Sequence, residues 1–180
     1  MNTRESFING IFGLRTRRFG SIAEIMIKRI YHLEDSNTLA YDKLDSNNNK
    51  RIEIKFSTVM KSNSEKIDET NAIDQCLKAD VVNRAMHYNE ISDNIFDCNI
   101  QQVKCIEFDV LYYGLFFADK ILIFKMLADE VKKSPGYSNK QHRNNEGEGQ
   151  FHINNKTINY HIENHLEMVL TYDELFNILK

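Results

Sequence analysis

The strongest constraint on the fold is one hydrophobic segment, CIEFDVLYYGLFFADKILIFKML, which runs from Cys105 to Leu127. It is rich in aromatic and β-branched residues, which are enriched in β-strands. Only the short stretch Ala118-Asp119-Lys120 interrupts it. The pattern predicts two central strands joined by a tight turn, so the chain is expected to fold around a β-sheet.

Helices are predicted before this segment. Residues 21–34, SIAEIMIKRIYHLE, carry apolar side chains at helical spacing, and Ser21 is the expected N-cap. Residues 58–67 read as a polar loop. A long amphipathic helix is then predicted over 68–88, with an apolar face made of Ile73, Cys76, Leu77, Val81, Ala85 and Tyr88.

The C-terminal third adds further elements. Residues 151–162, FHINNKTINYHI, predict a hairpin around Asn154-Asn155-Lys156. Thr171 and Glu174 form a capping box that opens a last helix. The order of elements is helix, strand pair, helix, strand pair, hairpin, helix. It predicts a single α/β domain over residues 1–180, in which helices flank a central mixed β-sheet.

Composition excludes several classes of protein. The net charge of -3 argues against a protein held on nucleic acid by bulk charge, although a nuclease can place its positive charge locally. The 3 cysteines include no CxxC pair, so neither a disulfide framework nor a zinc site is favoured. No apolar run approaches the length of a membrane span, and the sequence MNTRESFING lacks the pattern of a secretory signal. We therefore expect a cytoplasmic protein that is not embedded in a membrane.

The stretch Tyr41–Ser57, YDKLDSNNNKRIEIKFS, contains the main functional candidates. We expect a strand at Leu39–Leu44, a turn at DSNNNK and a second strand at Arg51–Ser57. Because side chains alternate along a strand, the second strand should present an apolar face and a polar face. The two faces are Ile52, Ile54 and Phe56 against Arg51, Glu53, Lys55 and Ser57.

This stretch has two other interpretations. Asp45, Asn47 and Asn49 occupy alternate positions, as in the first half of an EF-hand calcium loop. The calcium interpretation fails because Lys50 replaces the required glycine and Phe56 replaces the bidentate glutamate. A hairpin with a purely structural role stays an open alternative, since asparagines are common in turns.

The polar face of the second strand places Glu53 beside Lys55. An antiparallel preceding strand would bring another acidic residue, Asp42 or Asp45, close to them. Two carboxylates can hold a divalent cation, and a neighbouring ammonium group can act on the metal-bound water. Such a set of side chains suits the hydrolysis of a phosphodiester.

The spacing D-x10-E-x-K from Asp42 to Lys55 resembles the active-site hairpin of the PD-(D/E)xK nucleases, particularly type II restriction endonucleases. The resemblance implies a restriction-endonuclease-like core. It implies that Asp42 and Glu53 bind Mg²⁺, that the Ile54 carbonyl is a further ligand, and that Lys55 orients or deprotonates the attacking water. Asp42 matches the family's hairpin better than Asp45 does.

The resemblance covers residues 21–57 in detail. In the family, the helix before the hairpin often contributes a glutamate at the edge of the site, and Glu24 matches that position. The sequence departs from the pattern at Tyr41, where many members have a proline.

The resemblance implies a sequence-specific type II restriction endonuclease that hydrolyses phosphodiester bonds of double-stranded DNA with Mg²⁺. A homodimer would cut both strands of a symmetric site. One alternative is a structure-specific or repair nuclease of the same fold, such as a Holliday-junction resolvase. Another is a non-catalytic DNA-binding or partner-binding module whose acidic hairpin is only structural.

A DNA-recognition region is expected within residues 134–165. Arginine and lysine pair with guanine in the major groove, and asparagine and glutamine bind adenine. A polar loop without a partner is the alternative. The expected base-reading residues are Lys140, Gln141, Arg143, Asn144, Asn145, Gln150 and His152.

Other polar residues are expected to be structural. His161 and His165 have the spacing of a helical metal pair, but a strand is predicted there and no third ligand is near in sequence, so core or surface positions are favoured. Edge or turn positions likewise explain Glu107, Asp109 and Asp119 better than metal binding does.

Overall fold

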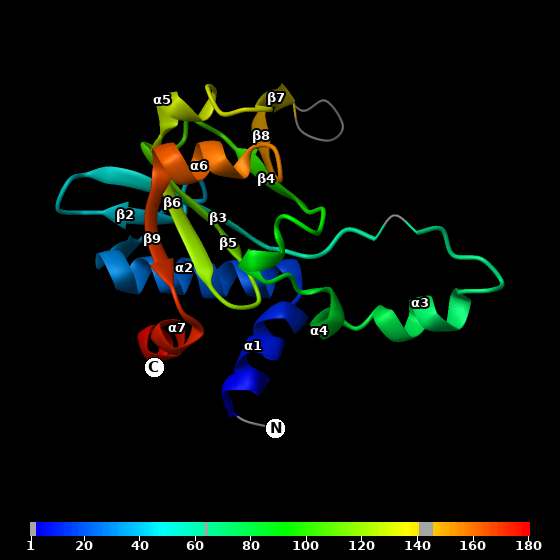
Figure 1. Ribbon diagram of the computed structural model, residues 1–180. Coiled ribbons are helices and arrows are strands. Elements are labelled where there is room, and N and C mark those ends of the chain that lie inside the picture. Colours follow the sequence, from blue (N-terminus) through cyan, green and yellow to red (C-terminus); the bar gives the residue numbers. More distant parts are fainter. Residues whose placement is uncertain (1–2, 64, 141–145) are drawn as a thin grey trace.

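The structure is a computed structural model that describes residues 3–63, 65–140 and 146–180 (Figure 1). Within these residues, the larger of two sheets has six strands in the order β1-β2-β3-β5-β6-β9. Its strands are β1 Glu34–Asp35, β2 Lys43–Asp45, β3 Lys50–Thr58, β5 Val110–Phe116, β6 Ile121–Leu127 and β9 Leu166–Leu170. A smaller antiparallel sheet, in the order β4-β8-β7, consists of β4 Asp97–Val103, β8 Glu146–Asn154 and β7 Ser138–Lys140.

Helices of the described residues cover both sides of the larger sheet, while α3 Ala72–Lys78 lies apart from it on an arm (Figure 1). None of them is long and apolar enough to cross a membrane. They are α1 Thr3–Gly13, α2 Thr16–Tyr31, α3 Ala72–Lys78, α4 Val81–Arg84, α5 Ala128–Val131, α6 Ile158–His165 and α7 Tyr172–Leu179, with a 3-10 turn at Tyr88–Glu90.

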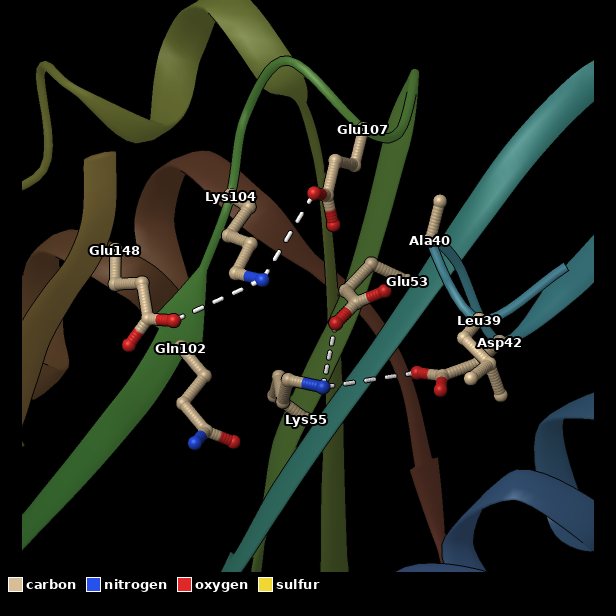
Figure 2. A pocket seen from close by; sticks show the side chains of 9 residues that line it. All are labelled: Leu39, Ala40, Asp42, Glu53, Lys55, Gln102, Lys104, Glu107 and Glu148. Carbon is tan, nitrogen blue, oxygen red and sulfur yellow. Dashed lines mark ion pairs between the residues drawn. The ribbon is translucent and has the colours of Figure 1, made fainter.

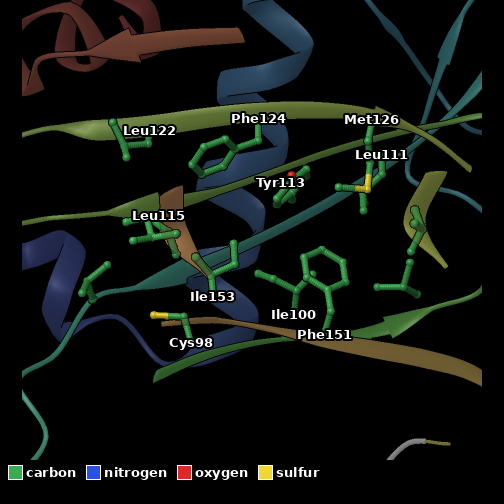
Figure 3. Close-up of a cluster of buried hydrophobic side chains, with 14 of the residues drawn as sticks. Cys98, Ile100, Leu111, Tyr113, Leu115, Leu122, Phe124, Met126, Phe151 and Ile153 are labelled. Carbon is green, nitrogen blue, oxygen red and sulfur yellow. The ribbon is translucent and has the colours of Figure 1, made fainter. Parts of the chain in front are cut away.

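The two faces of the larger sheet are covered differently. On one face, Ile52, Ile54, Tyr112 and Phe116 pack against apolar residues of α1, α2 and α7. On the other face, the central strands pack against β4 and β8, as Figure 3 shows. That second core contains Leu111, Tyr113, Leu115, Leu122, Phe124 and Met126 from the central strands and Cys98, Ile100, Phe151 and Ile153 from the smaller sheet.

The central strands confirm the expectation drawn from the hydrophobic segment. β5 and β6 pair in antiparallel register, and Phe117 N donates to Lys120 O at 2.9 Å in the turn between them. Every side chain of β5 is buried, which explains why the segment is continuously apolar. β3 runs parallel to β5, from Ile52 opposite Val110 to Thr58 opposite Phe116. The fold is therefore α/β, with a mixed central sheet flanked by helices.

The long helix expected over 68–88 is wrong. The chain forms α3, α4 and the 3-10 turn instead. Residues 84–86 pair with the chain after β3, because Lys61 N donates to Arg84 O at 2.8 Å and Met86 N donates to Val59 O at 3.1 Å. These bonds end the helix and bury Met86 in the core.

The hairpin expected over 151–162 is also wrong. β8 ends at Asn154, and Thr157 closes the turn by donating its hydroxyl to His152 O at 2.8 Å and accepting from Asn154 N at 3.0 Å. The following segment is the helix α6, and its buried side chains Ile158 and His161 recur at the i, i+3 spacing of a helix face. The alternation that suggested a second strand was too short to distinguish strand from helix.

The expected boundaries change in two other places. α2 begins at Thr16, so Ser21 lies inside the helix, where its hydroxyl donates to Arg17 O at 3.3 Å. Only the end of the expected strand Leu39–Leu44 is a strand. Side-chain hydrogen bonds of Ser36 and Thr38 hold the preceding chain in a loop. The capping box of Thr171 and Glu174 is confirmed at the start of α7.

The packing of β5 against β3 predicts a large effect of substituting Gly114. A Cβ atom there would overlap the carbonyl oxygen of Leu122 and the ring of Phe56. We expect Gly114→Ala to lower the free energy of unfolding by about 2 kcal/mol or more, measured by urea denaturation. Gly20→Ala is the matched control, because a Cβ at this position in α2 meets nothing within 4 Å. It should raise stability by up to about 1 kcal/mol, and equal effects of the two substitutions would contradict the packing.

Candidate active site

The turn between β2 and β3 is stabilised by Asp45. Its carboxylate accepts hydrogen bonds from Asn48 N at 3.2 Å and from Asn48 Nδ2 at 2.8 Å. Asn49 has a φ of 50°, a left-handed conformation that asparagine tolerates well. Asp45 therefore holds the asparagine turn with its side chain.

Asp42 lies just before β2 and faces β3. Its backbone N–H donates to Ile52 O at 3.0 Å, and its Oδ2 accepts from Ile54 N at 2.8 Å. The Asp42 side chain thus accepts the hydrogen bond that a backbone carbonyl of a longer β2 strand would have accepted from β3. It extends the hydrogen bonding between the two strands beyond the end of β2. This arrangement fixes the Asp42 carboxylate at the edge of β3, beside the E-x-K sequence.

Glu53 and Lys55 share one face of β3, as the alternation of the strand predicts. Lys55 Nζ lies 2.5 Å from Glu53 Oε1 and 3.7 Å from Asp42 Oδ2. Only 10% of the Glu53 side chain and 25% of the Lys55 side chain are exposed. The structure therefore brings Asp42, Glu53 and Lys55 together in one charged cluster.

This cluster lines a pocket of about 200 Å³ at the junction of the two sheets, shown in Figure 2. The opposite wall comes from β4, β8 and the loop after β4. There Lys104 Nζ lies 3.8 Å from Glu107 Oε1 and 3.7 Å from Glu148 Oε1. Gln102 also lines the pocket, and its φ of 58° marks the β-bulge in β4.

Sequence reasoning missed most of this second wall. Glu107 lies in a turn, as expected, with its N–H donating to Lys104 O at 2.8 Å, but it also lines the pocket with Glu53. Lys104, Gln102 and Glu148 carry no local signal, because only the long-range pairing of β4 with β8 brings them to the pocket. The other two acidic residues do have structural roles. Asp109 pairs with Arg51 at 2.9 Å, and Asp119 accepts from Tyr88 N at 2.7 Å.

The electrostatics of the cluster are dominated by burial. Burial raises the pKa of Glu53 to about 7. Lys55 lowers that pKa in part, whereas the nearby carboxylates of Asp42 and Glu107 raise it further. Burial also acts to lower the pKa of Lys55, but Glu53 and Asp42 outweigh it and hold the pKa of this ammonium above its ordinary value. Lys55 is therefore positively charged at neutral pH, and Glu53 is poised near its midpoint.

Glu24 lies at the edge of the cluster on α2 and does not line the pocket. Its Oε2 accepts a hydrogen bond from Lys43 Nζ at 3.1 Å, and Lys43 also pairs with Asp35 at 3.4 Å. Because Lys43 follows Asp42 directly in the chain, this ion pair ties the start of β2 to α2. In this arrangement Glu24 positions the hairpin.

Within the described parts of the chain, no group of three or more His, Cys, Asp or Glu side chains is arranged to hold a metal ion. Asp42 and Glu53 offer two carboxylates. The Ile54 carbonyl points to the same edge of β3 as the Ile54 N–H that Asp42 accepts, because both groups of one strand residue face one side. Magnesium is commonly bound by one or two carboxylates, with water and substrate phosphates completing its shell. The donor set fits such an ion.

The residues expected to read DNA are placed only in part. Gln141, Arg143, Asn144 and Asn145 lie outside the described residues. Lys140 ends β7, where its carbonyl accepts from Gln150 Nε2 at 3.3 Å. Gln150 Oε1 also accepts from Asn99 at 3.0 Å, and His152 Nδ1 lies 2.9 Å from the Asp97 carboxylate. Gln150 and His152 are thus bonded within the smaller sheet.

The histidine pair lies on α6, so the expectation of a strand there was wrong. The preference for a core position is confirmed for His161, which is fully buried and whose Nδ1 lies 2.8 Å from the Tyr113 hydroxyl. Burial and the neighbouring His165 lower the pKa of His161 to about 4. The neutral imidazole stacks on Phe151 within the core.

Comparison with known proteins does not assign the chain to a family, because no protein-family model matches its sequence and no curated protein matches it.

The buried Glu53 carboxyl predicts a stability that depends on pH. The pKa of Glu53 in the folded state is about 7, above the ordinary value of 4.5. The stability that the protonated Glu53 carboxyl contributes to the fold is therefore fully present below about pH 4.5 and is lost as the pH rises through about 7. We expect Glu53→Gln to raise the free energy of unfolding of the metal-free protein by about 3 kcal/mol at about pH 8 and to change it little at about pH 4.5. Urea denaturation at both pH values measures this difference.

The control is Glu90→Gln, which should have the opposite sign. Hydrogen bonds from Lys61 and the His87 backbone lower the pKa of Glu90, so its ionised form stabilises the fold at neutral pH. This variant should therefore be less stable than the wild type at about pH 8. A Glu53→Gln protein that is also less stable at that pH would show that the Lys55 ion pair outweighs burial.

Proposed function

We propose that this protein is a Mg²⁺-dependent DNA endonuclease of the PD-(D/E)xK type, acting as a type II restriction endonuclease. One observation carries the proposal. The Asp42 carboxylate is held against the E-x-K strand by Ile54 N and lies within 3.7 Å of Lys55 Nζ. Asp42, Glu53 and Lys55 thus converge in a pocket, as the resemblance to the nuclease hairpin requires.

The protein would hold the metal through Asp42, Glu53 and the Ile54 carbonyl. When bound, Mg²⁺ polarises the phosphoryl oxygen and lowers the pKa of a coordinated water. Asp42 and Glu53 have adjacent carboxylates of the same charge, and Glu53 has lost most of its water. A cation between them would relieve that repulsion, and the ammonium of Lys55 would then be available to orient the attacking water in line with the scissile bond.

The surrounding topology also supports a restriction-endonuclease-like core. A helix, α2, precedes the hairpin, and the chain after β3 crosses over to the parallel central strand β5. The family core requires further central strands after the E-x-K strand, and β5 and β6 occupy that position. By resemblance, the reaction leaves a 5′-phosphate and a 3′-hydroxyl. Two copies of the chain would cut the two strands of a symmetric double-stranded site.

A structure-specific nuclease of the same fold is the second candidate, and one observation favours it. Gln150 and His152, two of the expected base-reading residues, make hydrogen bonds within the protein to Asn99 and Asp97. Side chains used in this way would have to exchange partners before they could read bases. A nuclease that recognises the shape of branched DNA does not need that exchange.

Cleavage of DNA tests the proposal directly. Purified protein with Mg²⁺ should cut long duplex DNA into defined fragments, and Lys55→Ala should lower the rate by about 100-fold or more because the charged group that orients the attacking water is lost. Lys61→Ala is the matched control, since Lys61 is a partly buried lysine paired with Glu90 at 2.7 Å and does not line the pocket. It should cut at the wild-type rate.

The outcomes of this assay separate the alternatives. Cleavage of branched DNA alone would replace the restriction enzyme with the structure-specific nuclease. If no DNA is cleaved at any salt concentration, the protein is not a nuclease and the non-catalytic alternative remains. Wild-type cleavage by Lys55→Ala would show that the site has been placed wrongly.

The two aspartates of the hairpin should separate metal binding from turn stability. Asp42→Asn should abolish Mg²⁺ binding, measured by calorimetry, because it removes one of two carboxylate ligands. Asp45→Asn is the control. It should bind Mg²⁺ as the wild type does and lose about 1 kcal/mol of stability, since its carboxylate accepts the Asn48 hydrogen bonds. Loss of Mg²⁺ binding in Asp45→Asn but not in Asp42→Asn would reverse the assignment.

A further inference from the structure

Helix α3 stands apart from the two sheets, on an arm between β3 and α4 (Figure 1). Its burial is opposite to that of an ordinary surface helix. Gln75 is only 6% exposed, whereas Ile73 and Leu77 are 77% and 71% exposed. The helix thus turns a polar side chain inward and its large apolar side chains to the solvent.

Hydrogen bonds within the arm fix this orientation. Gln75 Oε1 accepts from Asn63 Nδ2 at 2.7 Å, and Gln75 Nε2 donates to Glu65. At 100° per residue, the helix places Ile73 and Leu77 on the side opposite Gln75, and Cys76 beside Ile73 at the edge of that side. These three residues, all exposed, form an outward apolar stripe.

We propose that this apolar stripe packs against the same stripe of a second copy of the chain, with the two α3 helices antiparallel about a twofold axis near Cys76. With a rise of about 1.5 Å per residue, Ile73 lies about 4.5 Å before Cys76 along the helix and Leu77 about 1.5 Å after it. In a reversed copy these positions interleave, so each Leu77 fits between two large side chains from the other copy and each Ile73 packs beside one at the end of the row. The stripe is therefore complementary in shape to itself.

The charges beside the stripe are also complementary to themselves. Asp74 and Lys78 are exposed on one side of it, two residues before and two residues after Cys76. A twofold axis near Cys76 keeps both residues on the same side and places Asp74 opposite the partner's Lys78, twice per dimer. A single acidic and a single basic residue give this face no net charge. Duplex DNA, which attracts clustered lysine and arginine, is a poorer occupant.

The inference assigns an interface to the homodimer of the proposed nuclease, and in that sense it rests on the proposed function. Its test uses no DNA, so its outcome is independent of whether the protein cleaves. The contact area of two short helices is small, and the complex should accordingly be reversible and dependent on concentration.

Sedimentation equilibrium over a range of concentrations provides the first test. The wild type should reach a dimer, and Leu77→Glu should raise the dissociation constant at least about tenfold because it places a charge in the stripe. Ile106→Glu is the matched control. Ile106 is 85% exposed, lies between β4 and β5, and receives the same type of substitution. A monomeric wild type at all concentrations, or a Leu77→Glu protein that dimerises normally, would overturn the proposal.

Charge reversal distinguishes a second copy from another protein partner. Asp74→Lys and Lys78→Asp should each weaken the dimer on the order of tenfold, because each places like charges opposite one another twice. The double variant should restore wild-type affinity. Mixing the two single variants should give a heterodimer in which both facing pairs join a lysine to an aspartate, so it should be tighter than either homodimer. Failure of the double variant to recover would overturn the antiparallel arrangement.

Cys76 supplies an independent measure of the geometry. It is exposed in the stripe, whereas Cys98 is buried and Cys105 is partly buried. A short bismaleimide should join two wild-type chains through Cys76 and should fail to join Cys76→Ser chains. Equal cross-linking of Cys76→Ser would place the contact elsewhere and overturn the proposal.

Discussion

The two central strands, β5 and β6, have to be covered on both faces, because nearly all of their side chains are apolar and buried. Helices α1, α2 and α7 cover one face, and the smaller sheet with α6 covers the other. Removal of this apolar surface from water is the main favourable contribution to folding. The positions of the outer elements, and the pocket between the two sheets, follow from this double coverage.

The candidate site lies at the edge of the sheet face that the smaller sheet covers, beside β3. Ile52 and Ile54 anchor β3 to the helical side, so Glu53 and Lys55 must face the smaller sheet. Glu53 loses most of its water there, which raises its pKa, and charges interact more strongly where water is scarce. The same burial that disfavours an ionised Glu53 would therefore strengthen its attraction for a cation. The buried Glu53 carboxylate thus lowers the stability of the fold at the position where it would raise the affinity of a hydrolytic site for its metal ion.

Local sequence patterns correctly predicted those elements whose structure depends mainly on residues close together in the chain. The alternation of β3, the hydrophobic run of β5 and β6, and the capping box of Thr171 each specify one structure. Prediction failed where contacts between residues far apart in the chain determine the structure. At Arg84, for example, a backbone hydrogen bond from Lys61 ends the helix. Asp42 and Asp45 have similar local sequence contexts, and only the hydrogen bonds to Ile54 and Asn48 separate them. Lys104 and Glu148 reach the pocket through the pairing of β4 with β8, which no local pattern encodes.

Helix α3 illustrates a different limit of sequence patterns. Its spacing of Ile73, Cys76 and Leu77 correctly indicates a helix with an apolar side, but periodicity does not say what that side packs against. An apolar side normally faces the core of its own chain. Here the side chain of Gln75, bonded to Asn63 and Glu65, fixes the opposite side inward, and the apolar stripe is left facing water. A regular amphipathic pattern that the fold leaves uncovered is thus better explained by contact between chains than by folding of one chain.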